Sequence, residues 1–147
     1  MTRALKISLL LFTFFTSYTL QANEAYEDAL KSFHKQAYNE TIIHLKNALK
    51  ADIDHIPSRI LLVETLVAQG KGALAEIELE DLQATGVDVN QLILLKAEAL
   101  LLQHKYDQVI DEISPGYRGR AIESKVQLFL GRAFLAKNRL RDADTAF

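Results

Sequence analysis

The chain has 147 residues, no cysteine and a formal net charge of −2. Its length is typical of one domain, and 49% of its residues are hydrophobic, enough for a sizeable core. The lack of a basic excess argues against nucleic acid as a partner, and the lack of cysteine excludes disulfides, thiolate metal sites and a lipid-bearing cysteine.

Residues 1–22 have the layout of a secretory signal peptide. Arg3 and Lys6 supply positive charge, and the apolar run over residues 7–15 is well short of the roughly 20 residues that span a membrane. A more polar tail ends in the small residue Ala22, after which we expect cleavage. The alternatives are an uncleaved N-terminal anchor and a buried helix. We therefore predict an exported, periplasmic protein, associated with a membrane only through this segment if it is retained.

Five sets of positions recur at one constant interval through the rest of the chain. The small or slim residues of one helix face are Ala29, Val63, Ala97 and Gly131. The turn positions are Gln36, Gly70, His104 and Asn138, and the positions after the turn are Tyr38, Gly72, Tyr106 and Leu140. Two further sets follow in the second helix: Thr41, Ala75, Val109 and Ala143, then Leu45, Leu79, Ile113 and Phe147. The interval matches the period of the tetratricopeptide repeat (TPR), which contains two helices in about 34 residues.

We therefore predict an all-α fold for residues 23–147, a right-handed TPR solenoid of antiparallel helix hairpins. Three complete repeats and an incomplete fourth lie near residues 22–55, 56–89, 90–123 and 124–147. Asn39 is the expected N-cap of the first hairpin's second helix, and Ser114–Tyr117, which contains Pro-Gly, is an expected loop. No polar capping helix follows the last apolar residues, so we expect either a longer natural chain or a truncated product, with a frayed final helix.

Two segments resemble one family of repeat proteins. The segment from Tyr38 to Lys50 resembles the opening repeat of the TPR-repeat proteins of the PEP-CTERM (exosortase) system, and Leu95 to Ile113 is similar to their third repeat. The likeness covers about residues 24–147. It implies export in a Gram-negative bacterium, a position at the N-terminal end of a much longer protein, and a link with exopolysaccharide and exosortase genes. Many of those proteins carry a lipid-attachment cysteine, and its absence here favours a soluble periplasmic form.

The sequence offers no set of catalytic or metal-binding groups, and we predict neither enzyme activity nor a cofactor. Its four histidines form no His-Glu-x-x-His pair. Glu76, Glu78, Glu80 and Asp81 are interpreted as a solvated helix face, although paired carboxylates also serve acid–base catalysis. Arg118 and Arg120 in the expected loop are open to two interpretations, contact with an anionic partner or solubility.

The predicted binding surface is the inner face of the array. Its residues are Tyr26, Leu30, Phe33, Ile60, Glu64, Val67, Leu94, Glu98, Leu101, Leu128, Arg132 and Leu135. Glu64 argues against a clamp for a partner's carboxylate, and an extended or helical segment with apolar anchors fits better. The other interpretation is that much of this face is core.

We predict a protein-interaction scaffold, an assembly factor in exopolysaccharide export or PEP-CTERM protein sorting. Its partner would be a protein or peptide, or further repeats of a longer chain. The alternatives are a periplasmic TPR adaptor of another envelope complex and, with no nucleophile–base pair to support it, a helical enzyme.

Overall fold

The structure is a computed structural model that describes residues 21–147. Apart from Gln21 and Ala22, the predicted signal peptide lies outside the described residues. Residues 21–147 contain helices joined by turns and one longer loop, and no strand occurs among them. The all-α fold is therefore confirmed for this part of the chain.

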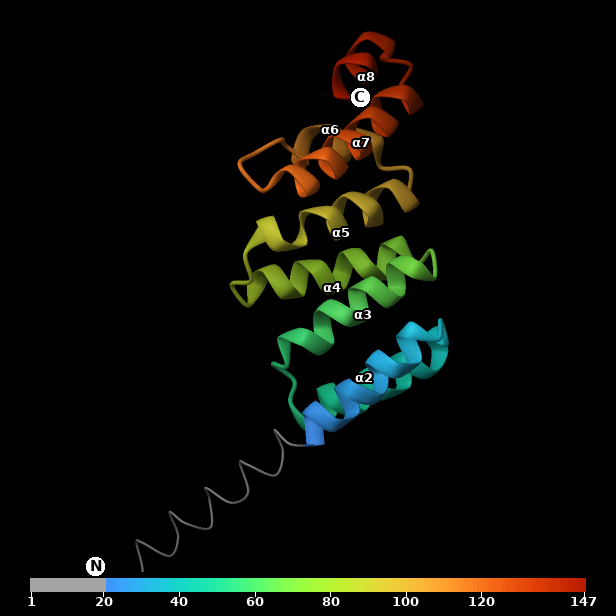
Figure 1. The fold of residues 1–147 in the computed structure, drawn as a ribbon, viewed down its shortest axis with the longest axis vertical. Coiled ribbons are helices and arrows are strands. Elements are labelled where there is room, and N and C mark those ends of the chain that lie inside the picture. The colour runs from blue at the N-terminus through green and yellow to red at the C-terminus, as the bar shows by residue number, and fades with distance from the viewer. Residues whose placement is uncertain (1–20) are drawn as a thin grey trace, which may run out of the picture. The chain divides into compact units, whose positions relative to one another are not determined.

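Helical residues 21–34 come first in the described part (Figure 1). The helices that follow are α2 (Tyr38–Ala51), α3 (Ile56–Ala68), α4 (Gly72–Ala84), α5 (Val89–Leu102), α6 (Tyr106–Glu112), α7 (Arg120–Ala136) and α8 (Leu140–Ala146). The described residues divide into two compact units, with the boundary between Thr65 and Leu66, within α3.

The turn inside each hairpin has the same backbone conformation. Its central residue is left-handed, with φ of 59°, 72°, 57° and 59° at Gln36, Gly70, His104 and Asn138. The next residue donates its N–H to a carbonyl five positions back, over 2.8–3.0 Å. These pairs are Ala37 to Ser32, Lys71 to Leu66, Lys105 to Leu100 and Arg139 to Phe134. This is the Schellman arrangement, which satisfies carbonyls that a helix end leaves free.

The residue that closes each turn also starts the next helix. Ala37, Lys71, Lys105 and Arg139 are the N-caps of α2, α4, α6 and α8, with similar torsion angles and no side-chain cap bond. The prediction of Asn39 as an N-cap is wrong, because the Schellman turn places the first helical residue at Tyr38. The backbone thus repeats at the same interval as the sequence, at both ends of the turn.

The residues that recur in the sequence are also the ones that pack inside. Ala29, Val63, Ala97 and Gly131 are all buried. The same holds for the set that begins with Thr41, and for Leu45, Leu79 and Ile113. Phe147, the last member of its set, is 66% exposed. Small side chains at recurring positions let paired helices approach closely, which explains their spacing.

The second unit has a continuous core. In it α5 contacts α4, α6 and α7, and α7 also contacts α6 and α8. The buried residues of the cluster include Ile93, Ala97, Leu100, Val109, Ile113, Val126, Phe129, Leu130 and Ala133. The α6 helix ends at Glu112, and the predicted loop at Ser114–Tyr117 is confirmed.

Candidate functional site

The twelve predicted face residues lie on the first helix of each hairpin, and each unit carries its own share. Tyr26, Leu30, Phe33, Ile60 and Glu64 belong to the first unit and are all partly buried. The other seven belong to the second unit. Of these, Val67 and Leu101 are buried and contribute to packing, whereas Glu98, Leu128, Arg132 and Leu135 are exposed and Leu94 is partly buried.

Two aromatic side chains of the first unit are held by ring contacts. Tyr26 meets the ring of His55 edge-on, with the centroids 5.4 Å apart, and the ring centroid of Phe33 lies 5.8 Å from that of Tyr38. Ring pairs of this kind stabilise an aromatic side chain in one orientation. Tyr38, at the start of α2, thus contacts an aromatic side chain of the preceding helix.

The ring of His55 is fixed through both of its nitrogens. Nδ1 lies 2.7 Å from Ser58 Oγ, and Nε2 lies 3.1 Å from Asn23 Oδ1. A hydroxyl beside an imidazole is also the geometry of a nucleophile and its base. Here Ser58 is completely buried, so its hydroxyl is closed to a substrate and serves to anchor His55. These residues were not predicted from the sequence, and the signal for them is a serine three residues after the histidine at a helix start.

Glu64 is a predicted face residue whose ionised form is disfavoured by burial. Burial raises the pKa of its carboxyl, and within residues 21–147 it forms no hydrogen bond or ion pair. Burial and then the Glu64 carboxylate raise the pKa of Tyr26, which places the phenol within electrostatic reach of the acid. A partly buried carboxylate without a counter-ion favours the approach of a cation. We call Tyr26, Leu30, Ile60 and Glu64 the Glu64 surface.

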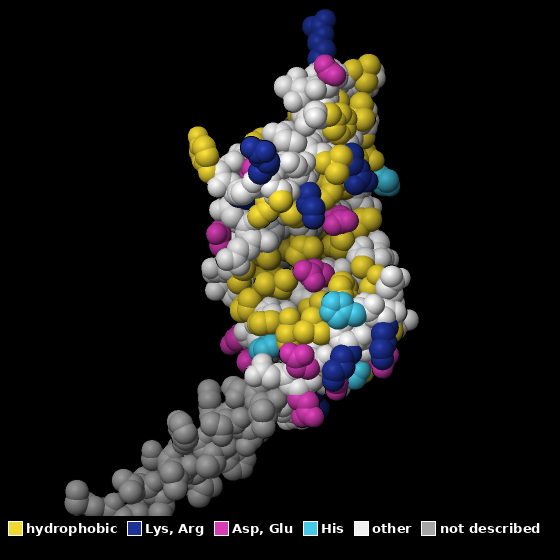
Figure 2. Space-filling view, in the orientation of Figure 1, with side chains coloured by type: hydrophobic (Ala, Val, Ile, Leu, Met, Phe, Trp, Pro, Cys, Tyr) yellow, Lys and Arg dark blue, Asp and Glu magenta, His cyan; other side chains and the backbone are white. Residues whose placement is uncertain are grey.

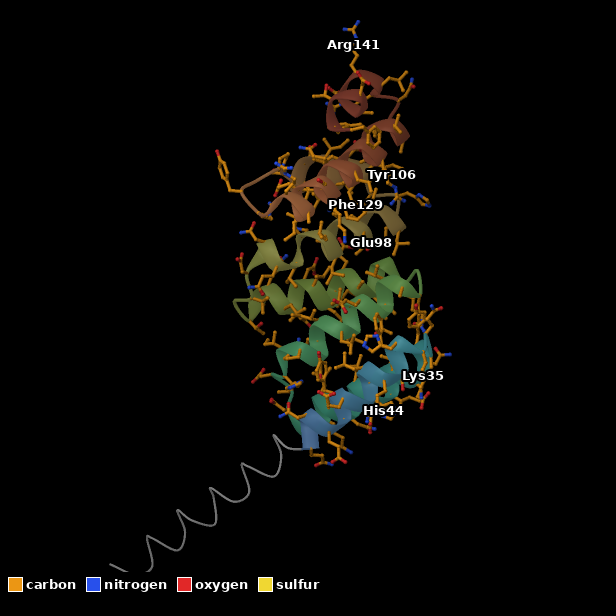
Figure 3. The ribbon with its side chains drawn as sticks, viewed as in Figure 1. Lys35, His44, Glu98, Tyr106, Phe129 and Arg141 are labelled. Carbon is orange, nitrogen blue, oxygen red and sulfur yellow. The ribbon has the colours of Figure 1, made fainter. Side chains whose placement is uncertain are left out.

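The second unit presents a surface of mixed character on α5 and α7. These helices lie side by side and run in the same direction (Figure 1). Leu128 and Leu135 are 47% and 49% exposed, and they flank Arg132 on α7. Glu98, labelled in Figure 3, is exposed on α5. Figure 2, drawn in the same view as Figure 1, shows hydrophobic side chains over this part of the molecule, with charged side chains among them. We call Leu94, Glu98, Leu128, Arg132 and Leu135 the α5–α7 face.

Neither charge of the α5–α7 face belongs to an ion pair among the described residues. The part of the chain that the structure describes contains no ion pair or hydrogen bond from the side chain of Glu98 or of Arg132. Other charges of the same unit are paired, such as Lys96 with Glu112 at 2.6 Å. Exposed apolar side chains beside unpaired charges are suited to binding another protein surface.

The acidic residues of α4 are only in part the solvated face that was predicted. Glu76 Oε2 accepts hydrogen bonds from Lys105 Nζ at 2.6 Å and Gln103 Nε2 at 2.8 Å, so this prediction is wrong for Glu76. The bonds join α4 to the turn after α5. Glu76, Lys96 and Glu112 also border a cavity of about 160 Å³. There Lys96 is paired with Glu112, and Glu76 is paired with Lys105.

Arg118 is not free to bind an anionic partner. Its guanidinium donates to Glu123 Oε1 at 2.7 Å, to Asn90 Oδ1 at 2.9 Å and to the Ser114 carbonyl at 3.0 Å. The N–H of Gly116 and the Arg118 guanidinium hold the pKa of Glu123 below its usual range. The arginine therefore fixes the loop between α6 and α7.

The described residues provide no site for metal chemistry and no membrane-spanning helix. Among them no three histidine, aspartate or glutamate side chains are placed to hold a metal ion. Searching the same residues finds no helix with the length and apolar character needed to cross a bilayer. Comparison with models of protein families, with curated proteins and with solved structures finds no match to this chain.

Proposed function

We propose that this chain is a TPR-type scaffold that binds protein or peptide partners in the bacterial envelope. The observation that carries the proposal is the hairpin turn, whose torsion angles and hydrogen bonds recur at the interval found in the sequence. Repeated hairpins of this length stack into extended arrays whose main known use is the display of binding surfaces. The right-handed superhelix predicted from the sequence is part of this proposal.

The Glu64 surface supports a partner that brings a cation and an apolar side chain. Glu64 lacks a counter-ion among the described residues, and Tyr26, Leu30 and Ile60 are only partly buried. A lysine or arginine from a peptide would neutralise the carboxylate, while its neighbours contact the aliphatic and aromatic side chains. An anionic partner would be repelled.

We further propose that the partner belongs to exopolysaccharide export or PEP-CTERM protein sorting. This rests on the signal-peptide layout of residues 1–22 and on the resemblance of Tyr38–Lys50 and Leu95–Ile113 to the repeats of that system. The second candidate is an adaptor of a different envelope complex, which the same signal segment and repeats support.

A strain that lacks the chain provides the test in the natural host. A photoreactive amino acid is placed at Leu30 on the Glu64 surface and, as a control, at Ile43, which is 60% exposed on α2. We expect a covalent adduct with an envelope protein from position 30 only, and its loss when Glu64→Arg is added. Equal adducts from both positions, or an adduct that Glu64→Arg leaves unchanged, would contradict the Glu64 surface as the binding site.

Secreted exopolysaccharide in the same strains tests the specific system. Loss of the chain, and the Glu64→Arg variant, should both lower it, whereas Glu40→Arg on the exposed part of α2 should not. Unchanged polysaccharide with a retained adduct would favour the adaptor of another envelope complex.

A further inference from the structure

The geometry points to a second copy of this chain as the occupant of the α5–α7 face, in a two-fold symmetric dimer. The inference deepens the proposed function, since it takes this face to be a protein-binding surface and names what binds there. The Glu64 surface lies in the other unit and is not part of this contact.

The two helices of the face are related by the repeat. Glu98 and Arg132 are separated by one repeat interval, as are Leu94 and Leu128. The turns after α5 and α7 also repeat at this interval, with φ of 57° at His104 and 59° at Asn138. Because α5 and α7 are in contact and run in the same direction, residues one repeat apart lie at corresponding levels of the two helices.

The α5–α7 face is complementary to itself under one two-fold axis. A two-fold axis that runs parallel to these helices, in front of the face and midway between them, places α5 of one copy over α7 of the other. Each residue of α5 then faces its own repeat equivalent across the interface. Glu98 meets Arg132 of the second copy and Arg132 meets its Glu98, while Leu94 meets Leu128 twice. Symmetric dimers use such self-complementary patches.

The charged residues of the face favour this axis. The face carries one acid and one base, both exposed and both without an ion pair in residues 21–147. The dimer supplies each with a counter-ion beside the exposed leucines Leu128 and Leu135. A two-fold axis that crosses the helices at the level of Glu98, within the plane of contact, would instead place α5 over α5 and bring Glu98 near Glu98, which like charges oppose. The charge arrangement therefore favours the axis parallel to the helices over this one.

Charge reversal provides the first test, on the purified 147-residue chain. Sedimentation should show a dimer for the unchanged chain and a monomer for Glu98→Arg and for Arg132→Glu, because each single change creates two like-charged contacts. The double variant should restore the dimer. Arg141→Glu is the matched control, since Arg141 extends from α8 into solvent (Figure 3) and its reversal should leave the dimer intact.

Cysteine cross-linking tests the axis, and the cysteine-free sequence gives a clean background. Leu94→Cys and Leu128→Cys chains carry tags of different size and are mixed and oxidised. We expect a disulfide between the two kinds of chain and none between chains of one kind, because Leu94 faces Leu128.

Three results would overturn the inference: a disulfide that joins two Leu128→Cys chains, the absence of any disulfide, or a dimer that withstands both single charge reversals. A monomeric chain that still gives the position-30 adduct would overturn the dimer alone and leave the scaffold function standing.

Discussion

The ring of Phe147 occupies the space into which a side chain at Gly131 would project. A Cβ built at Gly131 would lie 2.5 Å from Cε1 and Cζ of Phe147, closer than real contacts allow. The absence of a side chain in α7 thus lets the last residue of the chain pack against it, one residue beyond α8.

This relation predicts that Gly131→Ala changes stability differently with and without the Phe147 ring. With Phe147→Ala, the alanine should raise the free energy of unfolding by about 0.5–1 kcal/mol, because glycine destabilises a helix interior. With Phe147 present, the ring must leave its place, and the gain should shrink or reverse. Urea denaturation of the four proteins in a double-mutant cycle measures the coupling. An equal effect in both backgrounds would show that the ring does not contact Gly131.

Gly72→Ala should destabilise the second unit. A Cβ at Gly72 would lie 2.5 Å from the Ala99 carbonyl oxygen and 2.8 Å from Leu102 Cβ, so α4 and α5 would have to separate. Overpacking of this kind costs about 1–3 kcal/mol. Gly70→Ala is the control, because a Cβ there has no atom within 4 Å and only its left-handed φ of 72° opposes the change. Thermal denaturation should show the larger loss for Gly72→Ala, and the reverse order would contradict the close approach.

The Glu76–Lys105 ion pair should stabilise the second unit above acidic pH. Burial raises the pKa of Glu76, but the hydrogen bonds from Lys105 and Gln103 outweigh it and the net shift is downward. A lowered pKa in the folded state stabilises above the ordinary value near 4.5, and this stabilisation is lost as the pH falls through the folded value. Lys105→Met should therefore cost about 0.5–1 kcal/mol at neutral pH and progressively less at acidic pH. Urea midpoints across the pH range test this, with Lys125→Met as the exposed control.

Glu64→Gln should increase stability at neutral pH. Burial raises the pKa of Glu64, so the folded state binds its proton more tightly and stability decreases as the pH rises from the ordinary value near 4.5 through the raised one. Glutamine removes the charge and with it this pH dependence. The control is Glu80→Gln, whose side chain is exposed. A variant less stable than the parent at neutral pH would indicate that Glu64 has a counter-ion in solution.

Gln36→Gly should stabilise the first turn. Gln36 has φ of 59°, a conformation that costs a residue with a side chain roughly 1 kcal/mol and glycine almost nothing. Part of this gain is offset by the greater freedom of glycine in the unfolded chain, so we expect a net increase of about 0.5 kcal/mol. Gln36→Val should have the opposite effect, because β-branched residues rarely adopt this conformation. Urea denaturation compares the two.

The repeat could be predicted from the sequence because the positions buried between paired helices accept only side chains of a limited size. Ala29 and Ala97 are small and fully buried at equivalent positions, so the spacing survives in the sequence. The left-handed turns at Gln36 and His104 could not be predicted individually, since neither is glycine and their conformation is set by hydrogen bonds of the main chain.

The candidate face was predicted only in part. Periodicity places Leu101 and Leu128 on the same side of their helices, but it does not say how far the neighbouring helices cover them. Leu101 is buried and Leu128 is not, because packing within the unit differs at the two positions. The role of Glu76 was missed for a related reason: its partners Gln103 and Lys105 lie 27 and 29 residues away, beyond any local pattern.

The four hairpin turns are held by amide–carbonyl bonds, and the amino acid at their centre is Gln, Gly, His or Asn. Mutation can therefore exchange these residues at small cost while the bend persists. Lineages that descend from one such ancestor would lose recognisable similarity long before they lose their shape. Relatives of such a protein are then better recognised by the period of their backbone torsion angles than by the identity of aligned residues.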